Sequence, residues 1–204
     1  MAKIKLTKTE LKLHRDALKR FQRYLPTLQL KKQQLQLEVR QVREGASRLD
    51  ESLRALRAGL EAWVAVHDPA DAAGLAALLE VREWRVASRN IAGIDVPVFD
   101  GLDVVAKDYD LFLTPPWIDD ALEAARRHLE LRLRRQLADE QERLLGQELR
   151  VVTQRVNLFE KVKIPEAREN IRRIQISLGD QQTNAVGRAK IAKEKCQARE
   201  AAMA

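Results

Sequence analysis

Three histidines, one cysteine and a short acidic run are the residues of this sequence whose side chains most often do chemistry. His14, His67 and His128 are far apart, and Cys196 stands alone near the end of the chain. Metal sites and acid–base pairs need several such groups at close spacing, as in HExxH or CxxC, and neither motif is present. Residues 139–142, "DEQE", suit the charged face of a helix better than a metal cluster. We therefore predict a chain that is not an enzyme and binds no cofactor or metal.

Composition and charge further limit the class of protein. Of the 204 residues, 33% are charged and only 4% aromatic, which suits long packed helices better than a thick globular core. The net charge of +7 is uneven: residues 1–43 and 161–204 are basic, whereas residues 67–116 are acidic. No apolar run approaches the roughly 18 residues of a membrane span, and the start lacks a signal peptide's apolar core. The single cysteine excludes an internal disulfide framework and favours a reducing compartment, so a cytoplasmic location is expected.

The first segment repeats apolar residues in alternating steps of three and four. Sixteen positions from Leu11 to Trp63 follow this rule, and fourteen of them are apolar; His14 and Lys32 are the exceptions. Such heptads are typical of coiled-coil helices. We predict one helix from about residue 9 to residue 66, roughly 87 Å long at about 1.5 Å per residue.

Residues 67–116 break this pattern. A proline and a glycine in "HDPADAAG" end the helix, and residues 75–81 suit a short helix. Residues 83–101 alternate as in a β-hairpin whose turn falls near Ala92-Gly93. Pro97 predicts an edge strand, because proline cannot donate a hydrogen bond to a neighbouring strand.

The three tryptophans fall near the junctions between the helices and the hairpin. Because large aromatic side chains dominate small cores, we expect Trp63, Trp84 and Trp117 to form a small core there. Exposed contacts with a partner are the alternative.

A second long helix is predicted from about Trp117 to residue 195. Its apolar stripe consists of Ile118, Leu122, Ala125, Leu129, Leu133, Leu137, Leu145, Leu149, Val152, Val156 and Phe159, and it resumes with Ile164, Ala167, Ile171, Ile174 and Leu178. The step from Phe159 to Ile164 is five residues, and Pro165 follows at once. A proline inside a helix removes a backbone hydrogen bond and costs about 3 kcal/mol. The phase shift and the proline together predict a bend at this point.

These segments give a mainly α fold, a long antiparallel two-helix coiled coil with a small inserted region that contains a β-hairpin. We divide it into an N-terminal coiled-coil helix (residues 1–66), the insert with a short helix and the hairpin (67–116), and a long kinked C-terminal coiled-coil helix and tail (117–204). Folding the chain back places Pro26 near Asn157, which predicts a second bend close to the first. Two prolines tolerated in straight helices are the alternative.

The basic chain ends allow three interpretations. They are a solvated helix face, a nucleic-acid surface, or a surface that docks on acidic proteins. Nucleic-acid binding needs aromatic residues among the basic ones, and only residues 19–24, "KRFQRY", hint at it. Docking on acidic protein surfaces fits a long basic rod best, and we expect no nucleic-acid partner.

The segment "RVNLFEKVKIPEARENIRRIQ", residues 155–175, carries a resemblance to a known family. Arg-x-Asn, a Glu three residues later and an Ile-Pro pair before a basic helix resemble the D subunits of the V/A-type rotary ATPases; here these residues are Arg155, Asn157, Glu160, Ile164 and Pro165. "RNIAGIDVPVF" (89–99) is similar to the family's hairpin, and "LKRFQRYLPTLQLKKQQL" (18–35) to its first helix. Leu158 and Phe159 stand where the family usually has a small residue and a leucine.

The resemblance implies a central-stalk rotor subunit, the axle of the complex, that binds no nucleotide itself. It would turn inside a ring of three A and three B subunits, bind the F subunit and the funnel-shaped C subunit, and occur once per complex. It would couple ATP synthesis or hydrolysis to ion flow through a membrane rotor ring without entering the membrane, as a peripheral part of the complex on the cytoplasmic side. Basic residues near the tip are candidate contacts with the ring: Lys3, Lys5, Lys8, Lys12, Lys190 and Lys193.

Two other classes remain open at this point. A prefoldin-like holdase also combines two antiparallel helices with a hairpin, although prefoldins are usually shorter and have apolar tips. A homodimeric coiled-coil scaffold is the other alternative. The oligomeric state of the isolated chain separates these classes from a stalk subunit.

Overall fold

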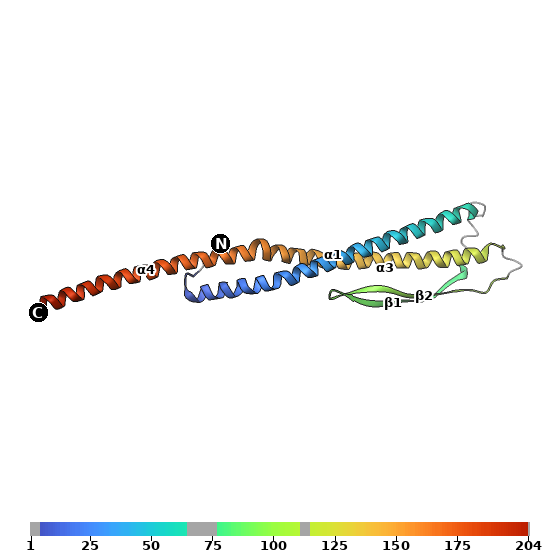
Figure 1. Ribbon diagram of the computed structural model, residues 1–204. Helices are drawn as coiled ribbons and strands as arrows, with labels where there is room; N and C mark the ends of the chain where they lie inside the picture. The colour runs from blue at the N-terminus through green and yellow to red at the C-terminus, as the bar shows by residue number, and fades with distance from the viewer. Residues whose placement is uncertain (1–4, 65–76, 111–114, 204) are drawn as a thin grey trace. The chain divides into compact units, whose positions relative to one another are not determined.

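A computed structural model describes residues 5–64, 77–110 and 115–203 of the chain (Figure 1). Its elements are helix α1 (Lys8–Val64), strands β1 (Leu79–Ile91) and β2 (Ile94–Ala106), helix α3 (Ile118–Asn157), a π-helical turn η1 (Leu158–Lys163) and helix α4 (Ile164–Met203). The strands form one antiparallel two-stranded sheet. The predicted fold class, mainly α with long helices and a hairpin, is confirmed.

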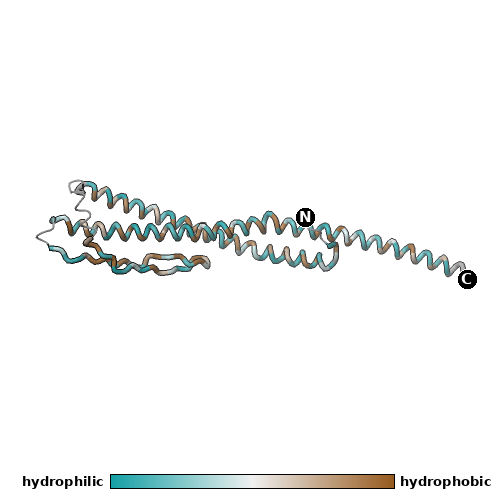
Figure 2. Tube along the Cα trace, turned by 180° about the vertical axis from the view of Figure 1, so that it is seen from behind, coloured by the Kyte–Doolittle hydropathy of each residue, from teal (hydrophilic) through white to brown (hydrophobic). Residues whose placement is uncertain are grey.

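The heptad stripe of the first segment is confirmed by burial. Every stripe position from Leu11 to Leu60 is buried or half-buried, including His14 and Lys32, and Leu35 is fully buried. Figure 2 shows hydrophobic residues recurring along the helices instead of gathering in one block. Helix α1 passes through Pro26 without a break, so the matched bends stay a prediction.

Close packing groups the chain into two units, which we call unit 1 (Met1–Leu30 with Val152–Ala204) and unit 2 (Lys31–Val151). Unit 1 joins the first part of α1 to a part of the chain far away in sequence, whereas unit 2 is one continuous segment with the rest of α1, the hairpin and most of α3. The division into residues 1–66, 67–116 and 117–204 followed the order of segments along the chain and stays a prediction. Its first boundary lies outside the described residues.

In unit 2, charged side chains join α1 to α3. Lys31 Nζ lies 2.9 Å from Glu148 Oε1, and Arg43 Nε lies 2.6 Å from Glu142 Oε1. Arg135 Nε donates to Asp50 Oδ1 at 2.8 Å. Because residue numbers rise along α1 as they fall along α3, these pairs show that the two helices run antiparallel, as predicted. Between them lie the buried side chains Leu35, Val39, Ala46, Leu137, Ala138 and Leu145.

The hairpin turns at Ala92 and Gly93, as the sequence predicts. Both residues have positive φ, 52° and 83°, which is the geometry of the tight two-residue turns that follow the twist of a hairpin. The Asn90 side chain caps this turn, since its amide donates to Asp95 Oδ1 at 2.7 Å and its oxygen accepts from the Gly93 N–H at 3.1 Å. Both strands are edge strands, which confirms the expectation for Pro97 in β2.

Strand β2 packs on the helices of unit 2, whereas β1 faces outward. Val96 and Val104 of β2 are buried, and the Arg134 guanidinium of α3 lies 4.7 Å from the centre of the Phe99 ring. The Gln141 side chain of α3 donates to the Pro97 carbonyl oxygen. Residues 80–90 of β1 are exposed throughout.

Two predictions for the insert are corrected by this packing. Trp84 is 46% exposed and belongs to no core, because it lies on the strand that the helices do not cover. Trp117 is half-buried, and the Trp63 side chain lies outside the described residues. Of the short helix predicted at residues 75–81, residues 77 and 78 are helical, but β1 already begins at Leu79, so the helix ends earlier than predicted.

In unit 1, α4 packs its apolar stripe against the first part of α1. The buried residues are Val152, Val156, Ile164, Ala167, Asn170 and Ile174. All but Asn170 were predicted; Asn170 is a buried polar residue where the predicted stripe has its neighbour Ile171, which is half-buried. From Gly179 to Arg199 every residue is exposed, and in Figure 1 this part of α4 extends past the beginning of α1.

Candidate functional site

The π-helical turn η1 occupies the place where the sequence predicts a change of phase. The Ile164 N–H donates to the Phe159 carbonyl, five residues back, instead of four as in an α-helix. This is the same five-residue step that separates Phe159 from Ile164 in the apolar stripe. The extra residue in the turn keeps Phe159 and Ile164 on the side that faces α1, so the apolar stripe continues across the turn.

Pro165 explains why the wider turn forms here. Proline has no N–H to donate, and in a regular α-helix its ring would meet the carbonyl four residues earlier. A π turn directly before it relieves that crowding, and such turns are frequent at functional sites. Pro165 itself is exposed, and the helix continues through it as α4.

Phe159 fixes the turn to α1. Its ring stacks on Phe21 with ring centroids 5.3 Å apart and an interplanar angle of 25°. A pair of this geometry contributes about 0.5–1.5 kcal/mol beyond its buried area. Phe21 therefore serves packing within the chain, and of the two aromatic residues in residues 19–24 only Tyr24 is exposed. The sequence placed both rings in the seam but did not pair them.

Of the five motif residues, one is buried and four are exposed. Ile164 is buried, whereas Arg155, Asn157, Glu160 and Pro165 are exposed on the last turn of α3, on η1 and at the start of α4. The structure thus brings them together along one short stretch. The three polar side chains form no side-chain hydrogen bond or ion pair with any described residue. They are available to another molecule.

The candidate lysines form two groups that the structure does not bring together. Lys5 lies just before α1 and Lys8 and Lys12 in its first turns, whereas Lys190 and Lys193 lie on the part of α4 that extends past it (Figure 1). All five are exposed, and none forms an ion pair among residues 5–64, 77–110 and 115–203. Lys3 lies outside the described residues.

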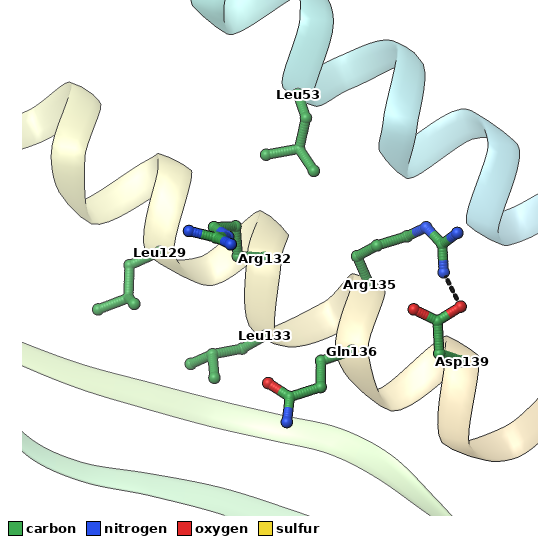
Figure 3. A pocket seen from close by; sticks show the side chains of 7 residues that line it. All are labelled: Leu53, Leu129, Arg132, Leu133, Arg135, Gln136 and Asp139. Atoms are coloured by element: carbon green, nitrogen blue, oxygen red, sulfur yellow. Dashed lines mark hydrogen bonds and ion pairs between the residues drawn. The ribbon is translucent and has the colours of Figure 1, made fainter.

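Unit 2 carries a groove between α1 and α3, shown in Figure 3. It has a volume of about 470 Å³ and is lined by Leu53 of α1 and by Leu129, Arg132, Leu133, Arg135, Gln136 and Asp139 of α3. The Arg135 guanidinium donates hydrogen bonds to both Asp50 and Asp139, and these two carboxylates raise its pKa. No pattern in the sequence predicts this groove, because it depends on how the two helices meet.

Neither a membrane span nor a metal cluster occurs in the part of the chain that the structure describes. Within those residues, no helix has an apolar stretch long enough to cross a bilayer. Nor do they hold a group of three or more His, Cys, Asp or Glu side chains that could bind a metal ion.

A long helix pair with a small hairpin and a π turn before a proline defines a mainly α coiled-coil protein. Residues 10–194 match the family described as the D subunit of ATP synthase. The V-type ATP synthase D subunit of Borreliella burgdorferi is 41% identical over 193 residues, which cover 95% of each chain. The corresponding proteins of Chlamydia caviae and Chlamydia abortus are 37% and 34% identical over 199 residues, covering 97% of this chain and 96% of each relative. The chain belongs to this family of ATP synthase D subunits, as the motif around Pro165 indicated, and is a subunit of a rotary ATPase.

Proposed function

We propose that this chain is the central-stalk rotor subunit of a V/A-type ATP synthase or ATPase. In this role it is the axle that turns inside the ring of A and B subunits. It has no catalytic site of its own, and it couples ATP synthesis or hydrolysis in that ring to ion flow through the membrane rotor ring. One copy per complex binds the F subunit and the funnel-shaped C subunit on the cytoplasmic side, without entering the membrane.

The exposed part of α4 is the observation that carries this proposal. Over residues 179–199 every side chain is exposed, including Val186 and Ile191. A single helix in water gains little stability from its own backbone, because most helical stability in proteins comes from packing. A stretch of this length is best explained by other subunits that surround it, as a ring would surround an axle.

The turn η1 gives such an axle the asymmetry that its work needs. Identical subunits around a straight, symmetric rod would all meet the same surface. A partner changes a conformational equilibrium only through a difference in its affinity for the states involved. The π turn and Pro165 make one side of unit 1 unlike the others, so each ring position meets a different surface as the axle turns.

The exposed lysines suit a sliding contact. Exposed ion pairs contribute roughly 0–1 kcal/mol each, so they form and exchange cheaply. Lys5, Lys8, Lys12, Lys190 and Lys193 lack partners among the described residues and are free to meet acidic groups on a ring wall in succession. The two groups, one on each helix, would act at different depths along the axle.

Neutralising these lysines tests the proposal. We expect the five Lys→Gln changes together to reduce ATP-driven ion pumping by the reconstituted complex several-fold, with the melting temperature of the isolated chain unchanged. A matched control neutralises five exposed basic residues of unit 2 instead: Arg40, Arg48, Arg82, Lys107 and Arg150. Equal pumping by both variants would refute the sliding contacts. Light scattering adds a check on the axle role, since a stalk subunit is expected to be monomeric alone and a homodimeric scaffold is not.

A further inference from the structure

One heptad from the ion pair between Asp50 and Arg135, the equivalent positions hold two basic residues in place of an acid and a base. Seven residues further along α1 stands Arg57, and seven residues back along α3 stands His128. Because the helices are antiparallel and the heptad repeats the same flank, these two side chains lie on the flank that carries Asp50 and Arg135. Here a cation faces a group that becomes a cation on protonation.

Arg132 adds a second positive charge at this place. It lies one helical turn from His128 on α3, so the two side chains share a face. Leu53 of α1 separates two recesses: the groove of Figure 3, which Arg132 lines, and a smaller one of about 410 Å³ lined by Asp50, Leu53, Arg54 and Arg57. Arg57 and Arg132 therefore line two recesses that share Leu53 as a lining residue, on the open flank of the helix pair.

No acidic side chain of the described residues neutralises this cluster. Arg57 and Arg132 form no ion pair in the described part of the chain, whereas Arg135 next to them holds two carboxylates. Arg57 of α1 and Arg132 of α3 are the charged groups that face His128. Burial, Arg132 and Arg57 lower the pKa of the His128 imidazole, in that order of influence.

We propose that Arg57, His128 and Arg132 form a binding site for a pair or cluster of carboxylates on the surface of another protein. Two arginines and a histidine on one flank, without a carboxylate partner among the described residues, run against ordinary charge pairing, and natural sequences break such local rules mainly at functional sites. The flank is open and shallow, which suits side chains on a protein surface, and the family consists of subunits of a multisubunit complex. The inference requires only family membership and does not depend on the axle role.

Binding of an acidic peptide tests this site in the full-length chain. A hexa-aspartate peptide is titrated at constant ionic strength while the NMR signals of the His128 imidazole are followed. We expect the peptide to raise the pKa of His128, because carboxylates stabilise its protonated form. Arg57→Gln and Arg132→Gln should each weaken peptide binding about tenfold, the equivalent of about 1.4 kcal/mol.

The controls decide between this site and a general attraction to a basic protein. Arg48→Gln and Arg150→Gln remove exposed arginines of unit 2 and should leave peptide affinity within about twofold. His128→Glu should raise the melting temperature by pairing with Arg57 and should abolish peptide binding, which a purely structural role would not predict. Equal losses in the control variants, no peptide binding, or a stronger effect of inorganic phosphate than of the peptide would each overturn the proposal. None of these outcomes bears on the ring, so the axle role is tested separately.

Discussion

The two units hold their helices together by different means. In unit 2 three ion pairs cross from α1 to α3, and the hairpin adds the contacts of Gln141 and Arg134. In unit 1 no ion pair crosses between α1 and α4 among the described residues; the salt bridges there, Lys163–Glu166 and Arg173–Glu169, join near neighbours in sequence. Its helices meet through apolar side chains, the stacked phenylalanines and the buried Asn170.

The charged side chains of unit 2 therefore bind one another, whereas many of those of unit 1 can bind another molecule. Unit 2 pairs many of its charges with its own residues and so fixes the alignment of its helices. Unit 1 leaves the five candidate lysines and the polar motif residues without partners among the described residues. The proposed axle role needs both properties, a part held rigidly and a part whose contacts can be exchanged.

The largest effect is expected from removing the exposed part of α4. A chain that ends at Leu178 should keep the melting temperature of the full chain, because residues 179–199 are exposed throughout. In the reconstituted complex it should lose ATP-driven pumping more than tenfold. Pumping and circular dichroism are measured side by side, and a chain shortened only by residues 200–204 is the control. Full pumping by the Leu178 truncation would contradict the contrast between the units.

Core truncations compare the two seams directly. Leu145→Ala in unit 2 and Ile174→Ala in unit 1 each remove a fully buried side chain. Each should cost about 2–5 kcal/mol in the free energy of unfolding, measured by urea denaturation. Leu37→Ala, at a side chain that is mostly exposed, should cost less than about 0.5 kcal/mol. A loss at Ile174 as small as that at Leu37 would show that unit 1 is not held by its apolar seam.

Much of this fold could be predicted because the spacing of apolar residues along the chain follows which side of each helix is buried. The heptads of α1 and the stripe of α3 and α4 identified the seam, and even the five-residue step at Phe159 marked the position of η1. A π turn adds one residue to a helical repeat, so the pattern contains it although its hydrogen bonds do not appear in the sequence.

What could not be predicted depends on which faces meet. Trp84 is a residue type common in cores, but the helices cover β2 and leave the side chains of β1 exposed to solvent. His128 looked isolated in the sequence, and its arginine neighbour on the other helix, Arg57, emerges only once α1 and α3 are aligned. The candidate site was found only in part for the same reason: the motif was visible, but the exposure of Arg155, Asn157 and Glu160 was not.

A smaller effect is expected from the ion pairs of unit 2. Arg135→Gln removes the bonds to both Asp50 and Asp139 and should destabilise the chain by about 1 kcal/mol, near the upper end for partly exposed pairs. Urea denaturation of this variant is compared with that of Arg150→Gln, which removes an arginine with no ion pair among the described residues and should change little. Identical curves would mean that charge does not fix the helices of unit 2.

The smallest effect concerns pH and His128. Its pKa in the folded chain lies below the ordinary value of about 6.5, so the unfolded chain binds the proton more readily. Stability should therefore fall as pH drops from about 7 through 6.5 toward the folded pKa, and His128→Gln should reduce this fall. Thermal melting between about pH 7.5 and 5.5 measures it. The same slope in both proteins would exclude His128 as the group responsible.

Rotation is the most direct measurement of the central claim. Ser88 lies on the exposed strand β1, so a Ser88→Cys variant in a Cys196→Ser background carries one label outside the helix seam. The labelled chain is assembled with its A, B and F subunits, the ring is fixed to a surface, and ATP is added. We predict that the label turns in one direction and pauses at three positions per turn. A label that stays fixed while the ring hydrolyses ATP would contradict the axle role.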